Sequence, residues 1–168
     1  MRFISKTNEA MHKEELVRMK HRRSIFEKSY GATFRSIRDA ERVRMPINER
    51  EELTRLLSEI ILHEIFFSSF DSPGKISEKI RKKHGSEASF LYELYECAKA
   101  ANGGFLLIFG DDSGRIDYYA GRDYDSLLKR RSPSLAIDRE EHAYFYDYFF
   151  ERDRYIKAAL SELNLSKI

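Results

Sequence analysis

The first part of the chain carries apolar residues at helical spacing. From 7 to about 43 they recur three, four or seven positions apart with no intervening proline, which predicts one long helix with a candidate kink at Gly31. Residues 45–47 break this pattern with a proline, and Asn48 is placed to cap a second helix that continues to about residue 70. Two helices joined by a short turn predict a helical hairpin.

The pattern changes after a proline- and glycine-containing break at 71–74. Two further helical segments follow, and then two runs rich in β-formers are joined by GDDSG, whose residues suit a tight turn between antiparallel strands. The elements expected in this part are helices at 75–84 and 87–101, strands at 103–109, 115–121 and 132–137, and helices from 138 to about 150 and from 154 to about 163.

Together these segments predict an α+β fold. An N-terminal long α-helical hairpin (1–73) is expected to precede a C-terminal α/β domain (74–168), which has a three-stranded antiparallel sheet with flanking helices. The chain has 168 residues, of which 42% are hydrophobic. That is enough for one substantial core, or for two smaller cores that share an interface.

Charge and cysteine usage narrow the class of protein. The 30 basic residues nearly balance the 28 acidic ones, so we expect neither a nucleic-acid partner nor a membrane partner, and the local basic runs at 21–23 and 79–84 are expected to be solvated helix faces. Cys97 is the only cysteine, which excludes an intrachain disulfide and fits a reducing compartment. No apolar run near the N-terminus resembles a signal peptide, and a cytoplasmic location is expected.

A carboxylate and an imidazole stand four residues apart in the stretch DREEHAYFYDY. On a helix, Asp138 and His142 would lie on one face and could direct an oxygen and a nitrogen to the same point, as two metal ligands do. Asp138 could equally be only a helix cap, because Glu141 follows it at capping-box spacing. These two interpretations are compatible with each other.

Histidines elsewhere supply further candidate ligands. His63 lies among apolar residues in ILHEIFFSSF, where an imidazole is costly unless it is hydrogen-bonded or bound to a metal. A hydrogen-bonded core histidine is the ordinary explanation for one such residue. Taken together, however, His21, His63, Asp138 and His142 offer three nitrogens and one oxygen from three elements, a set that suits iron or manganese.

At these residues the sequence resembles the iron/manganese superoxide dismutases. LHEIFF is similar to the family's histidine-plus-aromatics motif, and KKHGSEASFLYELYECAKAANGGFLLI resembles the segment that leads into its first strand. IDREEHAYFYDYFFERDRYIKAALSELN is similar to its Asp-x-x-Glu-His-Ala-Tyr signature and closing helix. The resemblance covers roughly 49–164 and is weak over 1–48.

The resemblance implies one five-coordinate iron or manganese ion, held by His21, His63, Asp138 and His142 with water or hydroxide as the fifth donor. Either His21 or His12 could face His63, and the sequence separations do not decide between them. We favour His21, because two apolar residues share its helical face and the HRR run is similar to the family's helix. The implied activity is dismutation of superoxide to O₂ and H₂O₂ by one-electron cycling of the metal.

The residues expected around the metal-bound solvent depart from the family. Glu59 and Arg122 stand at the two places where members have Gln, and they either face each other as a buried ion pair or leave Arg122 exposed in a loop. The family's second-sphere His and gateway Tyr, four and eight residues after the first ligand, become Ile25 and Ser29. Tyr30 could replace the Tyr only if the helix gains a residue locally, as in a π-bulge.

Two more implications concern assembly and activity. Glu141 is retained, and the resemblance implies that it reaches His142 of a second copy, so a homodimer is expected. The chain has no Trp, and Phe67, Phe105 and Glu140 stand where the family has indole rings. Because of these changes, two alternatives to an active dismutase stay open: a non-catalytic interaction protein of the same fold, and a metal enzyme of altered redox chemistry such as peroxide reduction.

Overall fold

The computed structural model describes residues 1–72, 74–111 and 113–168. The break expected at 71–74 and the turn expected at 110–114 include Pro73 and Asp112, which lie outside the described residues. The elements are α1 (Lys6–Tyr30), α2 (Ile37–Arg42), α3 (Ile47–Ser68), α4 (Glu78–His84), α5 (Glu87–Ala100), β1 (Phe105–Gly110), β2 (Ile116–Gly121), α6 (Asp125–Leu128), β3 (Leu135–Asp138), α7 (Glu141–Tyr148), α8 (Arg152–Glu162) and a final 3₁₀ turn, Leu165–Lys167.

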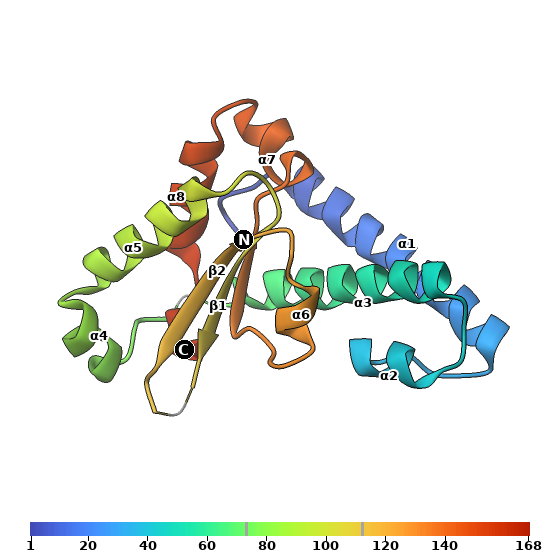
Figure 1. Cartoon of the computed structure of the whole chain (residues 1–168). Helices are drawn as coiled ribbons and strands as arrows, with labels where there is room; N and C mark the ends of the chain where they lie inside the picture. Colours follow the sequence, from blue (N-terminus) through green and yellow to red (C-terminus); the bar gives the residue numbers. More distant parts are fainter. Residues whose placement is uncertain (73, 112) are drawn as a thin grey trace.

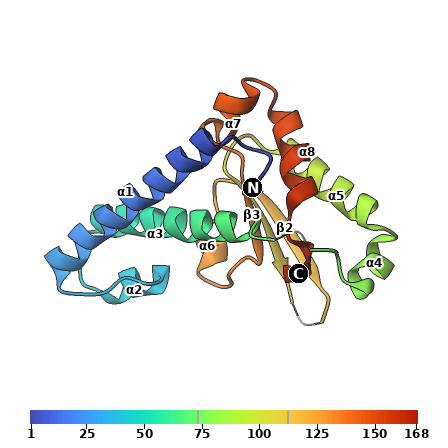
Figure 2. The ribbon, with the colours of Figure 1, turned by 180° about the vertical axis from the view of Figure 1, so that it is seen from behind.

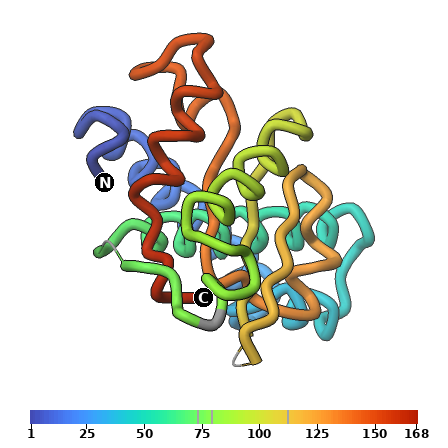
Figure 3. The backbone as a smooth tube through the Cα atoms, turned by 90° about the vertical axis from the view of Figure 1, so that its left-hand side faces the viewer, coloured from blue at the N-terminus to red at the C-terminus, as the bar shows by residue number. Residues whose placement is uncertain are grey.

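The expected α+β architecture is confirmed. Figure 1 shows the long helices α1 and α3 on one side of a small sheet, and α5 and α8 on the other. The sheet has the strand order β2-β1-β3, and both pairings are antiparallel. Helix α3 packs along β3, whereas α5 and α8 pack against each other, as the view in Figure 3 also shows.

The single long helix expected from 7 to about 43 is two helices in the structure. Gly31 adopts a left-handed conformation, with φ 57°, and its N–H donates to the carbonyl of Glu27. Such a residue ends a helix instead of kinking it, because no further residue can continue the hydrogen-bond ladder. The short α2 therefore follows α1 and precedes α3 in the sequence. Figure 2 shows it below the N-terminal part of α3, near the C-terminal end of α1.

One hydrophobic core joins the helical first part of the chain to the sheet. Leu62 and Phe66 of α3 are buried in the same cluster as Leu106 and Leu107 of β1, and Phe3 reaches this cluster from the N-terminus. In the described part of the chain, no helix is both long enough and apolar enough to cross a membrane. The shared core fixes how α3 sits on β3, and this contact brings the candidate ligands together.

Candidate metal centre

The centre forms where α1, α3 and the β3–α7 junction meet. His12 and His63 are buried on α1 and α3, and Asp138 is a fully buried residue at the end of β3. The Asp138 Oδ2 atom lies 2.9 Å from His142 Nε2, 3.7 Å from His63 Nε2 and 3.9 Å from His12 Nε2. Three imidazole nitrogens from three helices therefore converge on one carboxylate oxygen.

Asp138 and His142 do not share a helix, contrary to the expectation from their spacing. Asp138 is the last residue of β3, α7 begins at Glu141, and Glu140 is the N-cap of that helix. The Asp138 Oδ1 atom accepts a hydrogen bond from the Glu140 N–H at 2.9 Å, which turns the chain from strand to helix. The other oxygen, Oδ2, faces His142, so the pair meets across a turn and not along a helix face.

His63 has its free nitrogen directed at the centre. Its Nδ1 atom lies 2.8 Å from the carbonyl oxygen of Glu59. Because a carbonyl only accepts hydrogen bonds, Nδ1 carries a proton, and in the neutral ring Nε2 therefore has the lone pair. Nε2 is buried and has no hydrogen-bond partner among the described residues. Both ring nitrogens of His12 are likewise buried and have no hydrogen-bond partner among the described residues.

Burial, hydrogen bonding and neighbouring charges together set the pKa values of the residues in the cluster. Burial lowers the pKa of His12 to about 4, although the Asp138 carboxylate opposes this shift. Burial also lowers the pKa of His142, but the hydrogen bond to Asp138 and its charge outweigh burial and raise that pKa to about 9. Burial raises the pKa of the Asp138 carboxyl, yet the hydrogen bond from His142 and the three nearby imidazoles bring it below its ordinary value.

His21, which the sequence analysis favours as the first ligand, lies outside this cluster, whereas His12 lies within it. The two residues are nine positions apart, which is about two and a half turns of α-helix, so they point to opposite faces of α1. His21 is exposed, and so are Val17 (64%) and Ile25 (52%), the apolar residues that share its face. The buried residues of α1 are Asn8, His12 and Met19.

The hydrogen bonds of Asn8 explain why His12 faces the cluster. Its Nδ2 atom donates to the carbonyl of Ala143 at 3.0 Å and to Asp147 Oδ2 at 3.1 Å, which ties the start of α1 to α7. Because His12 follows one turn after Asn8, it lies opposite the first turn of α7. Positions 8, 12 and 19 share one helix face, but two of these three residues are polar, so no apolar pattern marks this face in the sequence.

Of the two arrangements considered for Glu59 and Arg122, the structure has the one in which Arg122 is exposed in a loop. Arg122 does not face Glu59: its guanidinium makes two 2.7 Å hydrogen bonds with the carboxylate of Glu140, and its side chain is 68% exposed. Glu59 is half-buried, and burial raises its pKa. Tyr30 donates a hydrogen bond to Glu49 at the far end of α1, about 27 Å along the helix axis from His12.

Arg139 was not identified from the sequence, although it follows a candidate ligand directly. Its side chain is buried, and its guanidinium donates to the carbonyls of Ala98, Ala101 and Gly103. These carbonyls lie at the C-terminal end of α5, where a cation also interacts favourably with the helix dipole. Arg139 thus holds the β3–α7 junction against α5.

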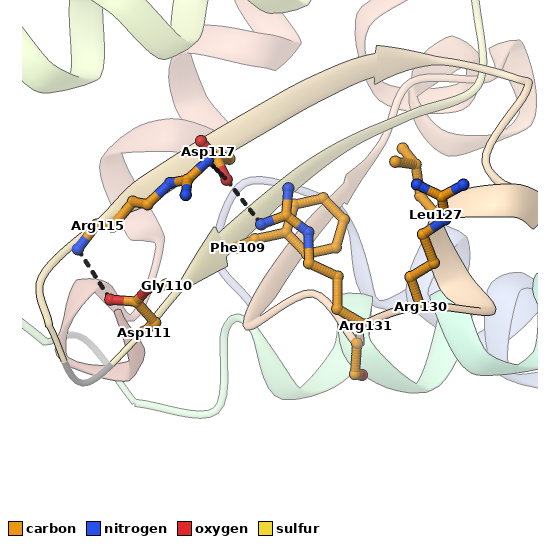
Figure 4. A pocket seen from close by; sticks show the side chains of 9 residues that line it. Phe109, Gly110, Asp111, Arg115, Asp117, Leu127, Arg130 and Arg131 are labelled. Carbon is orange, nitrogen blue, oxygen red and sulfur yellow. Dashed lines mark hydrogen bonds and ion pairs between the residues drawn. The ribbon is translucent and has the colours of Figure 1, made fainter.

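Two cavities differ in their relation to the centre. One, of about 500 Å³, is lined in part by Arg122, Glu141 and His142 and lies at the outer edge of the cluster. Another, also about 500 Å³, lies where β1 ends and β2 begins, and none of the cluster residues line it (Figure 4). In that cavity Arg131 lies over the Phe109 ring and 2.7 Å from Asp117.

Comparison with known proteins assigns the chain to a family. Residues 72–168, more than half of the chain, match the model for iron/manganese superoxide dismutases, C-terminal domain. The chain belongs to the iron/manganese superoxide dismutase family. It is 30% identical over 69% of its length to "Superoxide dismutase [Fe]" of Cupriavidus metallidurans, and 32% identical over 58% of its length to "Superoxide dismutase [Mn] 1" of Halobacterium salinarum.

The chain spans 62% and 52% of the lengths of these two relatives. A third superoxide dismutase, the "[Fe]" protein of Aquifex pyrophilus, is 31% identical over 62% of this chain and 53% of its own length.

If His12 is the first ligand, the positions four and eight residues later are Leu16 and Lys20. These positions therefore carry neither the His nor the Tyr that the family resemblance implies. Lys20 instead forms an ion pair, with its Nζ atom 2.6 Å from Glu64 Oε1.

Proposed function

We propose that this chain is a superoxide dismutase-type metalloprotein in which His12, His63, Asp138 and His142 hold one iron or manganese ion. The observation that carries the proposal is the convergence of three imidazole Nε2 atoms on Asp138 Oδ2, two of them buried without another partner. A buried polar atom without a partner costs about 1–3 kcal/mol. A cation at this point would satisfy all of these atoms together.

The donor set fits the proposed ions. Three neutral imidazoles and one carboxylate are suited to iron and manganese, and the relatives include proteins named for each metal. When bound, the ion supplies the one-electron chemistry that converts two superoxide anions and two protons into O₂ and H₂O₂. His142 must be neutral to act as a ligand, so metal binding releases the proton that Asp138 otherwise holds on it.

Aromatic residues around the proposed ligands hold three of them in position. Phe66 packs against the ring of His12, and Phe105 against the ring of His63, with centroid separations of 5.4 and 5.5 Å. Tyr155 donates a hydrogen bond to the Asp138 carbonyl at 2.7 Å. These contacts limit the rotation of His12, His63 and Asp138, and the burial of these three residues strengthens the electrostatic interactions between them.

We also propose that the protein is a homodimer in which Glu141 of one copy reaches His142 of the other. Glu141 is exposed, and the His142 side chain is 41% exposed while its Nε2 atom faces Asp138. Phe145 in the middle of α7, and Phe149 and Phe150 just after its C-terminal end, are 40%, 64% and 90% exposed. Apolar side chains gathered in this way are typical of a surface that a partner covers.

The test is metal analysis of the purified protein together with a superoxide assay. We expect about one iron or manganese per chain and dismutation that is lost in His63→Ala. Stoichiometric metal without dismutation would refute the activity and leave the metal site standing, in favour of a protein of altered redox chemistry. Metal content that is unchanged in His63→Ala would refute the site itself.

A further inference from the structure

The cavity where β1 ends and β2 begins has several arginines in its wall (Figure 4). It measures about 500 Å³, and its charged lining residues are Arg115, Arg130, Arg131, Asp111 and Asp117. Arg115 directly precedes β2, whereas Arg130 and Arg131 lie in the loop between α6 and β3. Three guanidinium groups from two separate segments therefore line one space, and none of them belongs to the metal cluster.

Two residues of the sheet hold Arg131 in place. Phe109 and Asp117 stand directly opposite each other on β1 and β2, so their side chains lie on the same face of the sheet. The Arg131 guanidinium carbon lies 4.0 Å from the centre of the Phe109 ring, and Nη1 donates to Asp117 Oδ2 at 2.7 Å. A guanidinium has five N–H donors, so these contacts fix its orientation and leave donors for a further acceptor.

The two carboxylates in the wall do not balance the three cations. Asp117 is shared between Arg131 and Arg115, whose Nη2 atom lies 3.4 Å from it. Asp111 accepts a hydrogen bond from the backbone N–H of Arg115 at 3.0 Å, within its own turn. Arg130 is exposed and forms no ion pair with any carboxylate in the described ranges. The wall therefore keeps positive charge that attracts an anionic ligand.

We propose that this cavity binds a phosphate monoester of about nucleotide size, a function separate from the proposed metal chemistry. The planar fork of an arginine matches two oxygens of a phosphate at once, and several arginines suit a doubly charged group. A volume of about 500 Å³ is typical of small-molecule sites, which measure about 300–1,000 Å³, and it exceeds what an inorganic ion fills. The guanidinium face of Arg131 opposite Phe109 can stack on a planar base.

The experiment titrates the protein as purified with adenosine monophosphate, in an isothermal titration calorimeter. Adenosine is the uncharged control ligand, and inorganic phosphate is the control that lacks the organic part. We expect about one nucleotide per chain, weaker binding of phosphate and no binding of adenosine at the same concentrations. Arg130→Gln and Arg131→Gln should each weaken nucleotide binding at least about tenfold, because each removes charge-assisted hydrogen bonds to the phosphate.

Two further variants separate this cavity from other causes of binding. Arg152→Gln is the matched control, because Arg152 lines the other cavity, at the outer edge of the metal centre, and its loss should leave the nucleotide affinity unchanged. Asp117→Asn frees Arg115 and Arg131 from their shared carboxylate. The nucleotide should then bind roughly threefold more tightly, a gain that damage to the fold does not produce.

Several results would overturn the inference, and none of them bears on metal content or dismutation. Unchanged affinity in both Arg130→Gln and Arg131→Gln would place the nucleotide elsewhere on the protein. Equal weakening in Arg130→Gln and Arg152→Gln would show attraction by overall charge alone. Adenosine or inorganic phosphate binding as tightly as the nucleotide would exclude a phosphate monoester as the ligand. Circular dichroism checks the fold of each variant, and Arg130→Gln breaks no ion pair of the described residues.

Discussion

Asp138 Oδ2 and His142 Nε2 lie 2.9 Å apart across the turn between β3 and α7. The last residue of a strand and the first turn of a helix thus hold two of the candidate ligands, and antiparallel pairing of β3 with β1 fixes the position of Asp138 opposite Phe105. A ligand at a strand end is fixed by the sheet, whereas His142 depends on the orientation of α7.

The first prediction separates His12 from His21. His12→Ala should lower iron or manganese content at least about tenfold, because it removes a buried imidazole that faces Asp138. His21→Ala should leave metal content unchanged, since that side chain is exposed on the opposite face of the same helix. Metal analysis of the two variants, grown and purified in parallel, makes the comparison, and the reverse result would return His21 to the site.

The positions of His12 and His21 show what the sequence can predict. The order of helices and strands follows from local periodicity, and the predicted strands lie within a few residues of the observed ones. The facing residue of α1 does not follow, because the helix has polar residues on all sides and its buried face is defined by contacts with α7. Asn8 bonds to Ala143, more than 130 positions away, and no local pattern carries that information.

Arg122 and Arg139 illustrate the same limit. The partner of Arg122 is Glu140, and not Glu59, which one of the two arrangements considered from the sequence pairs with it. Arg139 donates to three backbone carbonyls, at the C-terminal end of α5 and in the residues that follow it. Backbone carbonyls have no signature in the sequence, so a buried arginine whose partners are all carbonyls is read as a surface residue. The shared core and the sheet were predictable because they depend on apolar patterns instead.

The second prediction concerns the dimer. Glu141→Ala should convert a dimer into a monomer in sedimentation velocity, since the proposed contact to the partner's His142 is lost. Glu96→Ala is the control, because Glu96 is also an exposed helical glutamate but lies on α5. Metal affinity should fall together with dimerisation if Glu141 supports the second ring nitrogen of the ligand. Unchanged sedimentation in Glu141→Ala would show that this interface is not used.

The third prediction concerns the ion pair of Arg122 and Glu140. In the intact protein the two charges largely cancel at the metal. Arg122→Gln leaves the Glu140 anion unbalanced and should lower the midpoint potential of the iron-loaded protein, whereas Glu140→Gln leaves a cation and should raise it. The double variant should return towards the original value. Redox titration measures all four proteins, and shifts of the same sign in both single variants would contradict the argument.

The last prediction tests the buried arginine. Arg139→Met keeps much of the side-chain volume but leaves the carbonyls of Ala98, Ala101 and Gly103 without their donor. Each unpaired buried carbonyl costs about 1–3 kcal/mol, so the free energy of unfolding should fall by about 3 kcal/mol or more. Arg152→Met is the matched control: Arg152 is only partly buried and makes one 3.2 Å hydrogen bond to the Lys99 carbonyl at the same helix end, so its loss should cost less than about 1 kcal/mol.

Urea unfolding of the metal-free proteins measures both variants, because a bound ion would add its own binding free energy to the native state. Burial lowers the pKa of Arg139, and burying a cation without a carboxylate partner has a desolvation cost that its hydrogen bonds must exceed. If Arg139→Met is as stable as the unmodified protein, that cost cancels the hydrogen bonds. The arginine would then orient the β3–α7 junction without stabilising the fold, and Arg139→Met should still lose metal at unchanged stability.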